Sequence, residues 1–197
     1  MSAGVLSSSS WRRMVTPQTM IRPEAIWQTG RLAARPASQA DARVLFHEYA
    51  TDPEVATYMT WRPHSAVAET ADFLRRCENV WLDGSAFPWT LWLKETGELA
   101  GLIEARVRTP AVDIGYALVR RRWRQGLMSE AVDAVIRWAF SQPEIFRVWA
   151  TCDVENVASA RLLEHVGMQR EGVLRRWIVH PNISATPRDC YCYAIVK

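Results

Sequence analysis

Residues 112–140 read VDIGYALVRRRWRQGLMSEAVDAVIRWAF, and this stretch decides the fold because it joins an apolar strand, a basic loop and an amphipathic helix. Its first eight residues are largely apolar apart from Asp113, which is typical of a central strand, and Gly115 indicates a bulge or a close backbone approach. The basic loop ends at Gly126, and a helix is expected over residues 128–140. The apolar positions at helical spacing are Val132, Val135, Ile136 and Ala139.

The segments on both sides of this unit extend it into a mixed sheet. Residues 87–93 and 99–107 alternate with period two around the turn Glu95-Thr96-Gly97-Glu98, so they are predicted to pair antiparallel. A strand at 147–152 followed by a helix that Asn156 opens completes a βαβ crossover. The other predicted elements are a strand at 31–35, helices capped by Ser38 and Ser65, and strands at 172–180 and 190–197.

These elements predict the fold class α/β (α+β). The sheet is expected to be mixed and mostly antiparallel, with about 6–7 strands and about four helices on both of its faces. The crossover makes one neighbouring pair of strands parallel. No internal repeat interrupts this order.

Length and composition favour one globular domain over residues 21–197, because the chain has 197 residues, of which 49% are hydrophobic and 23% charged. Residues 1–20 contain four consecutive serines and no apolar periodicity, so they are expected to form a flexible N-terminal extension. The sequence has no apolar run long enough to span a bilayer and no signal-peptide pattern. A cytoplasmic protein that does not bind membranes is therefore predicted.

No metal site is expected from the cysteines and histidines. The four cysteines form no CxxC pair, and the histidines lack the spacing of metal ligands. We predict reduced, structural cysteines and histidines that pack or face solvent. These residues are Cys77, Cys152, Cys190, Cys192, His47, His64, His165 and His180.

The loop before the helix predicted over residues 128–140 carries the clearest chemical signal. Amide groups at a helix N-terminus, with Gly126 allowing close approach, form a site for a pyrophosphate group. The loop matches neither the Walker motif nor GxGxxG. Its four arginines with Trp123 could also contact nucleic acid, but a phosphate-bearing ligand is sufficient to explain them, so nucleic-acid binding is not expected.

From Arg31 to Lys197 the sequence resembles the GNAT acyl-CoA-dependent N-acetyltransferases, and within them the branch of ribosomal-protein N-terminal acetyltransferases. Each matching stretch is weak alone, and their order and spacing carry the likeness. The stretches are Asp52-Pro53-Glu54-Val55, Lys94-Glu95-Thr96-Gly97-Glu98-Leu99, Ile114-Gly115-Tyr116, Trp123-Arg124-Gln125-Gly126-Leu127-Met128-Ser129-Glu130-Ala131, Asn156-Val157-Ala158-Ser159, Leu163-Glu164-His165-Val166-Gly167-Met168, Glu171-Gly172-Val173-Leu174-Arg175 and Arg188-Asp189.

The resemblance implies that acetyl-CoA binds between two splayed parallel strands, which end here at Val119 and Cys152. Backbone groups of Leu118 and Val119 would contact the pantetheine arm and the thioester, and Asn156 and Ser159 would reach the arm from the other side. The pyrophosphate would lie on the amides of Arg124, Gln125, Gly126, Leu127, Met128 and Ser129. The family usually has Gly or Ala where Met128 stands and often Gly at Arg124, so these side chains must point away from the phosphates.

The implied chemistry needs an amine without its extra proton, a stabilised oxyanion and a proton for the leaving thiolate. Glu104 and Asp113 interrupt apolar strands beside the expected gap, so either is a candidate base. The N–H of Leu118 would serve the oxyanion. Leu163 stands where many GNAT enzymes have an acidic tyrosine, so Ser159 is the candidate for bonding the thiolate. No cysteine has an evident activating neighbour.

The leading prediction is an N-acetyltransferase that moves the acetyl group of acetyl-CoA to a primary amine, a protein N-terminus or a small molecule, by direct attack in a ternary complex. A catalytically silent GNAT-like domain that binds CoA or a protein partner is the alternative, and a ribosome-associated RNA-binding protein is a third. Trp61 and Trp89 are candidates for lining the acceptor groove. The aromatic surplus is consistent with a homodimer.

Overall fold

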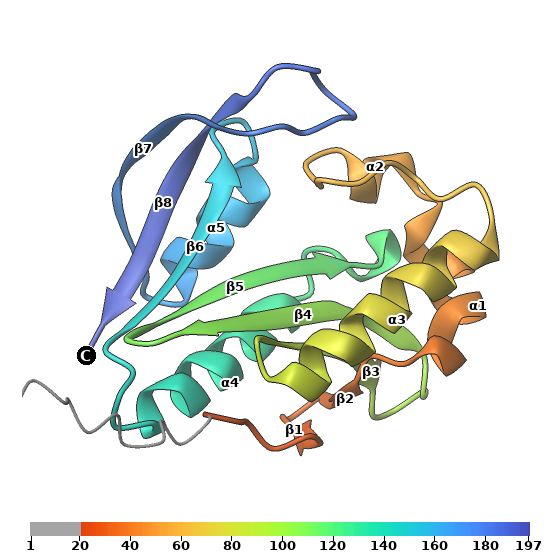
Figure 1. Ribbon diagram of the computed structural model, residues 1–197, viewed down its shortest axis with the longest axis horizontal. Coiled ribbons are helices and arrows are strands. Elements are labelled where there is room, and N and C mark those ends of the chain that lie inside the picture. The colour runs from red at the N-terminus through yellow and green to blue at the C-terminus, as the bar shows by residue number, and fades with distance from the viewer. Residues whose placement is uncertain (1–20) are drawn as a thin grey trace, which may run out of the picture.

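The computed structural model describes residues 21–197, and the extension predicted for residues 1–20 lies outside them. Eight strands form one sheet (Figure 1). They are β1 (Trp27–Gln28), β2 (Leu32–Pro36), β3 (Ala86–Leu93), β4 (Leu99–Arg108), β5 (Ala111–Leu118), β6 (Arg147–Asp153), β7 (Gln169–Ile178) and β8 (Arg188–Val196). The helices are α1 (Ala42–Leu45), α2 (Pro53–Ala56), α3 (Val67–Asp83), α4 (Leu127–Ser141) and α5 (Val157–His165).

The sheet runs in the order β1-β2-β3-β4-β5-β6-β8-β7, and every neighbouring pair is antiparallel except β5 and β6. The parallel ladder covers three residue pairs, the last of which joins Asp113 to Trp149. Beyond this pair the two strands diverge, as Figure 1 shows. The mixed, mostly antiparallel sheet with a splayed parallel pair is therefore confirmed. The sheet has one strand more than predicted because the short β1 pairs with β2.

The helix starts follow local capping, with one correction. Ser38 caps a 3-10 turn at Gln39–Asp41 by accepting a hydrogen bond from the backbone of Ala40. Ser65 was expected to cap the helix now called α3, and this is wrong because the N-cap is Ala66. The Ser65 hydroxyl instead donates to the carboxylate of Glu69 at 2.6 Å, which fixes the chain entering α3.

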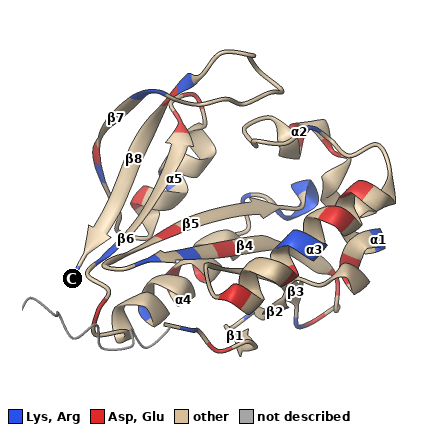
Figure 2. Cartoon of the chain, viewed as in Figure 1, with Lys and Arg blue, Asp and Glu red and all other residues tan. Residues whose placement is uncertain are grey.

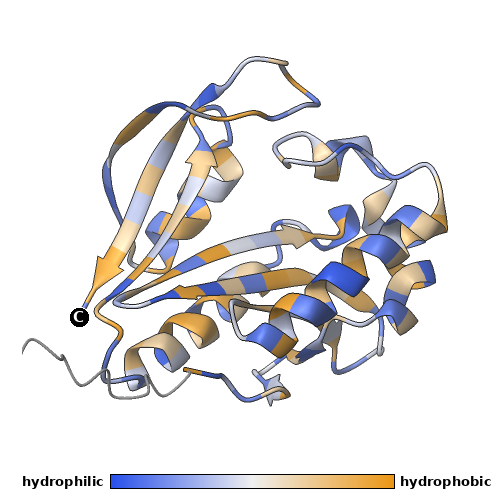
Figure 3. Cartoon of the chain, in the orientation of Figure 1, coloured by the Kyte–Doolittle hydropathy of each residue, from blue (hydrophilic) through white to orange (hydrophobic). Residues whose placement is uncertain are grey.

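The sheet separates two hydrophobic cores, and α3 crosses in front of it while α5 lies behind β6 (Figure 1). One core packs α4 and α5 against the sheet through Val112, Ile114, Val148 and Ala150. The other packs α1 and α3 against it through Leu99, Leu102 and Val119. We call these sides the α5 face and the α3 face. Figure 3 shows the hydrophobic residues concentrated along β4 and β5, which supply both cores.

Side-chain alternation assigns the remaining residues of β5 and β6 to faces. Since Val112 and Ile114 lie on the α5 face, Asp113 and Gly115 lie on the α3 face, and Tyr116 packs back on the α5 core. By the same rule Trp149 lies on the α3 face of β6. The opening between β5 and β6 is thus lined by different side chains on the two faces of the sheet.

No helix among residues 21–197 is long and apolar enough to cross a membrane.

Candidate active site

The end of β5 presents an unpaired backbone N–H toward the opening. The N–H of Val119 donates to the carbonyl of Ala100 in β4 at 2.9 Å. Successive strand residues point their backbone groups in opposite directions, so the N–H of Leu118 points away from β4, toward the side from which β6 has diverged. The carbonyl of Leu118 accepts a hydrogen bond from the Trp123 indole at 3.1 Å. Leu118 therefore offers an amide donor to the opening.

Val119 already has a hydrogen-bond partner within the chain for each of its backbone groups. Its N–H is bonded to Ala100, and its carbonyl accepts from the N–H of Arg122 at 2.8 Å. Its side chain is buried in the core on the α3 face. Both backbone groups of Val119 are therefore already used within the chain.

The predicted phosphate loop ends in the N-terminus of α4. Gly126 is the N-cap at φ 73°, a left-handed conformation that glycine adopts without strain, and Arg124 also has a positive φ of 60°. Helix geometry leaves the first amides of α4 without partners inside the helix. Met128 is 2% exposed, so its side chain points into the core and away from the loop surface. The departure from Gly or Ala at this position therefore leaves the amides accessible.

Arg31, which directly precedes β2, holds this loop in place through hydrogen bonds. Its guanidinium donates to the carbonyl of Gln125 at 2.7 Å and to the carboxylate of Glu130 at 2.7 Å, and its backbone N–H donates to Glu130 at 2.8 Å. Burial opposes ionisation of Glu130, but the hydrogen bonds from Thr29 and Arg31 outweigh it and lower the pKa of Glu130. No sequence pattern predicts this support, because Arg31 and Gln125 lie far apart in the chain.

Three of the four arginines after β5 have partners other than phosphate, which corrects their interpretation as a phosphate cluster. Arg120 pairs with Asp52 at 2.9 Å, Arg121 pairs with Glu48, and Arg122 pairs with Glu98. Figure 2 shows this basic turn directly beyond the end of β5, close to α2. Among the residues that the structure describes, Arg124 forms no ion pair and is exposed. Arg124 is thus the arginine available to an anion here.

Ser159 meets a tyrosine that the sequence analysis did not single out. Asn156 caps α5 by accepting a hydrogen bond from the N–H of Ser159 at 3.1 Å. The Oγ of Ser159 lies 2.8 Å from the hydroxyl of Tyr116 on β5. Burial raises the pKa of Tyr116 above its usual range, so the phenol keeps its proton. Either hydroxyl can donate in this pair, and Ser159 is also a hydrogen-bond partner of the Cys152 thiol.

Both candidate base residues are held by one arginine on the α3 face. Arg106 donates to Asp113 at 2.7 Å and to Glu104 at 3.0 Å. Glu104 is in register with Gly115, which lies beyond the last β5–β6 pair, whereas Asp113 belongs to that pair. Glu104 is therefore level with the part of β5 that has diverged from β6, whereas Asp113 lies at the last paired position. The spacing in sequence did not reveal the shared arginine, because the cross-strand register creates it.

A second charged cluster closes the far end of β6. Arg188 donates to the fully buried carboxylate of Asp153 at 2.6 Å, and the Nε2 of His180 lies 3.6 Å from the same carboxylate. Burial favours the neutral acid, but the hydrogen bonds from Arg188 and the backbone outweigh it and lower the pKa of Asp153. The segment after β7 also reaches α2, because the Asn182 amide donates to the carbonyls of Ala56 and Trp61 at 2.6 and 2.8 Å.

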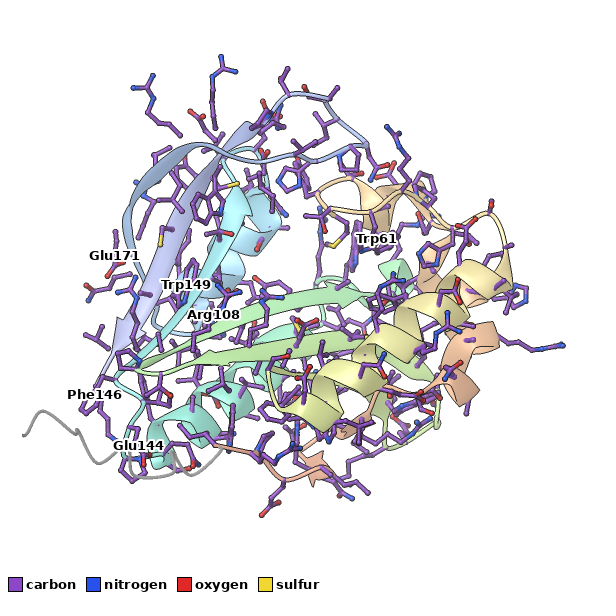
Figure 4. The ribbon with its side chains drawn as sticks, in the orientation of Figure 1. Trp61, Arg108, Glu144, Phe146, Trp149 and Glu171 are labelled. Carbon is purple, nitrogen blue, oxygen red and sulfur yellow. The ribbon has the colours of Figure 1, made fainter. Side chains whose placement is uncertain are left out.

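The two tryptophans expected to line the acceptor groove lie in different surroundings. Trp89 is 1% exposed and its indole donates to the carbonyl of Ala25, so this expectation is wrong for Trp89. Trp61 lies beside α2, and Figure 4 places Trp149 of β6 on the opposite side of the opening from it. The alternation of buried residues along β6, with Val148 and Ala150 inside, is the signal that could have identified Trp149.

The cysteine thiols are poor nucleophiles. Burial raises the pKa of Cys77 to about 12, of Cys152 to about 11 and of Cys190 to about 12. All four cysteines are free. The site therefore supports direct transfer between bound reactants better than transfer through a covalent thioester on the enzyme.

Comparisons with known proteins agree with this geometry. Residues 31–169 match the family described as acetyltransferase (GNAT) domain. The chain is 34% identical to the N-acetyltransferase p20 of Bacillus licheniformis, over 86% of this chain and 94% of that protein. A GNAT-family acetyltransferase structure from Bacillus anthracis aligns with a TM-score of 0.74 at 26% identity, over 87% of this chain and 98% of that one.

The fold is also shared with RimL, a ribosomal-protein α-N-acetyltransferase solved in complex with coenzyme A. This structure aligns with a TM-score of 0.77 at 21% identity, over 87% of this chain and 97% of that one. The family match covers more than half of the chain, and the p20 relative is similar over nearly its full length. The chain therefore belongs to the GNAT acetyltransferases, a family of acyltransferase enzymes.

Proposed function

We propose that the protein transfers the acetyl group of acetyl-CoA to a primary amine by direct attack of that amine on the thioester. The observation that carries the proposal is the unpaired N–H of Leu118 at the opening between β5 and β6, directly before the phosphate loop. An amide in this position is placed to stabilise the oxyanion of an acyl transfer. The reaction forms a C–N bond, breaks the C–S bond and releases the thiol of CoA.

The loop residues fit the donor. Amides of Arg124, Gln125, Gly126, Leu127, Met128 and Ser129 would hold the pyrophosphate at the positive end of the α4 dipole. Gly126 adopts a conformation that suits close approach, and the buried Met128 side chain leaves the amide surface open. Asn156, whose Oδ1 caps α5, keeps its amide NH₂ for the pantetheine arm.

Glu104 is the base that we propose, acting directly or through a water molecule. It lies on the α3 face beside Gly115, and its bond to Arg106 is the longer of the two that this arginine makes. Asp113 holds the other side of Arg106 and positions it. Glu104 would take one proton from the ammonium group, which leaves the amine lone pair free to attack.

Ser159 would donate its hydroxyl hydrogen to the departing sulfur from the α5 face. Tyr116 would support this role by donating its own proton to the Ser159 oxygen, which lies 2.8 Å from the phenol. The amine thus approaches from one face of the sheet while the thiolate is stabilised from the other. A catalytic tyrosine at the position of Leu163 is not required by this arrangement.

The acceptor is a protein N-terminus or a small molecule in this proposal. RimL, which shares the fold, is named for acting on a ribosomal protein. Trp61 and Trp149 are the aromatic side chains that we propose for the walls of the acceptor groove in this protein. We propose residues 21–197 as the single catalytic domain, a cytoplasmic location, and an acetylation reaction that does not depend on nucleic acid.

Calorimetric titration with acetyl-CoA, compared between the wild type and Gly126→Trp, tests the donor site. We expect micromolar binding that the variant loses, since an indole at Gly126 would occupy the phosphate surface. Amine acceptors, including peptides with free N-termini, are then compared by release of the CoA thiol. A folded wild type that does not bind acetyl-CoA would refute the proposal, and binding without turnover of any acceptor would favour a silent CoA-binding domain.

A further inference from the structure

An arginine-lined cavity beyond the end of β6 has no role in the reaction described above. Its volume is about 650 Å³, within the usual range for ligand sites of roughly 300–1,000 Å³. It lies where β7 and β8 join the loop between them, and Figure 2 shows basic residues at this end of both strands. The lining residues are Val154, Arg175, Arg176, Ser184, Thr186, Pro187, Arg188 and Asp189.

The arginines of this cavity differ in their partners. Arg188 is neutralised by Asp153 and Glu155, at 2.6 and 2.8 Å. Within residues 21–197, neither Arg175 nor Arg176 forms an ion pair, whereas ten other arginines do. Two guanidinium groups without a paired carboxylate therefore line the cavity, together with the carboxylate of Asp189.

The backbone at Arg176 is held in an unusual conformation. Its φ is 47°, which a residue with a side chain rarely adopts, and it lies in an irregularity of the β7–β8 register. The Asp189 carboxylate stabilises this conformation by accepting the Arg176 N–H at 2.8 Å. Backbone strain of this kind persists where surrounding contacts fix it, and here it sets the direction of a charged side chain.

Two chain segments connect the cavity to the proposed acceptor opening. Val154 follows the buried Asp153 at the end of β6 and precedes Asn156 by two residues. The loop that supplies Ser184 and Thr186 also contains Asn182, whose amide binds the α2 segment across the opening. An acceptor whose amine lies at the opening would follow these segments to place another group in the cavity.

We infer that the acceptor carries an anionic group, a carboxylate or a phosphate, which Arg175 and Arg176 bind while its amine is acetylated. This inference rests on the proposed function and narrows its substrate class. Guanidinium groups suit both anions because they donate paired hydrogen bonds to two oxygens. The hydroxyls of Ser184 and Thr186 supply further donors at the same cavity.

Binding of matched probes to the enzyme–CoA complex tests the inference without requiring turnover. One pair is a short peptide with a free N-terminal serine followed by two glutamates, and its twin with two glutamines. The other pair is ethanolamine phosphate and ethanolamine. The variant combines Arg175→Gln with Arg176→Gly, because glycine accepts the positive φ at 176, and Arg75→Gln on α3 is the control.

We expect one anionic probe to bind roughly tenfold tighter in calorimetry than its twin without the added anionic group, and the pair that shows this identifies carboxylate or phosphate. The preference is expected to disappear in the double variant and to persist in Arg75→Gln. Absence of any preference, or its survival in the double variant, would overturn the inference. A double variant that loses affinity for CoA but keeps it for 3′-dephospho-CoA would also overturn it, by assigning the arginines to the donor. None of these outcomes depends on acetyl transfer, which the acceptor comparison measures separately.

Discussion

The hydroxyl of Tyr116 lies 2.8 Å from the Oγ of Ser159, although the two residues come from β5 and α5, on opposite sides of the divergence between β5 and β6. Tyr116 keeps its proton, and when it donates to Ser159 the hydrogen of Ser159 is directed elsewhere. The pair therefore fixes a hydroxyl donor in the part of the site where the proposal requires the thiolate to leave.

Removing either member of this pair is expected to slow the chemical step. Ser159→Ala should lower kcat by roughly 10²-fold, as for loss of a general acid, and Tyr116→Phe by about tenfold, as for loss of one orienting hydrogen bond. KM for acetyl-CoA should change little in Tyr116→Phe. Steady-state kinetics of both variants and of the double variant measure this.

The double variant distinguishes positioning from general damage to the fold. If Tyr116 acts through Ser159, the double variant should be no slower than Ser159→Ala alone. Multiplying effects, or a Tyr116→Phe variant that raises KM for acetyl-CoA without lowering kcat, would contradict the positioning role.

Replacing the two carboxylates that bind Arg106 with amides should have different effects on kcat/KM and on its pH profile. Glu104→Gln is expected to lower kcat/KM by roughly 10²-fold and to remove the acidic limb of its pH profile, since it deletes the proposed proton acceptor. Asp113→Asn should retain the limb, because it removes only a partner of Arg106. The pH dependence of kcat/KM for both variants provides the measurement. An acidic limb that survives in Glu104→Gln and vanishes in Asp113→Asn would assign the base to Asp113.

Met128 is proposed to contribute in two ways: its buried side chain stabilises the core, and its backbone amide binds the pyrophosphate. Met128→Ala is expected to lower the free energy of unfolding by about 2–5 kcal/mol, because it leaves a cavity in the core beneath the phosphate loop. The affinity of the folded variant for CoA should stay near the wild-type value, since the backbone amide is retained. Urea unfolding and calorimetry test the two parts separately. A loss of affinity for CoA in a fully folded variant would show that the Met128 side chain, and not its amide alone, determines the conformation of the phosphate loop.

The buried thiols predict a loss of stability at alkaline pH. Their folded-state pKa values, about 12 for Cys77 and Cys190 and about 11 for Cys152, exceed the ordinary value of 9.0. Below pH 9 both states keep these protons, so this contribution to stability is intact there. As the pH rises above 9 the unfolded chain releases them first, and the free energy of unfolding declines.

Urea unfolding at pH 8, 9 and 10 measures this slope. Alanine at Cys77, Cys152 and Cys190 should flatten it, even where the substitutions lower stability at every pH. Alanine at the half-buried Cys192 is the comparison variant. Equal slopes for the wild type and the triple variant would contradict the assignment to these thiols.

Much of the fold could be predicted from local patterns. The period-two alternation of residues 87–93 and 99–107, with four turn residues between them, leaves little alternative to the β3–β4 hairpin. The strand–loop–helix pattern around Gly126 likewise specifies β5 and α4. The two-residue β1 carries no such pattern and exists only because β2 offers it an edge.

The site could be predicted only as far as its residues are close in sequence. The phosphate loop and the Asn156 cap are local, so their motifs identify them. The triplet of Glu104, Arg106 and Asp113 depends on the register between β4 and β5, and the Tyr116–Ser159 pair depends on how α5 packs behind the sheet. These relationships arise from tertiary packing, which the sequence patterns do not encode.

The three-pair ladder between β5 and β6 makes the sheet two half-sheets that share a short seam. The first five strands form one half, and β6, β8 and β7 form the other. At the far end of the opening, the Asn182 side chain connects the C-terminal half to the α2 segment of the N-terminal half. A ligand lodged between the halves would become a structural member of the sheet, so amide hydrogen exchange near Leu118 should slow when the donor binds. In the proposed reaction the cosubstrate would complete the architecture as well as the chemistry.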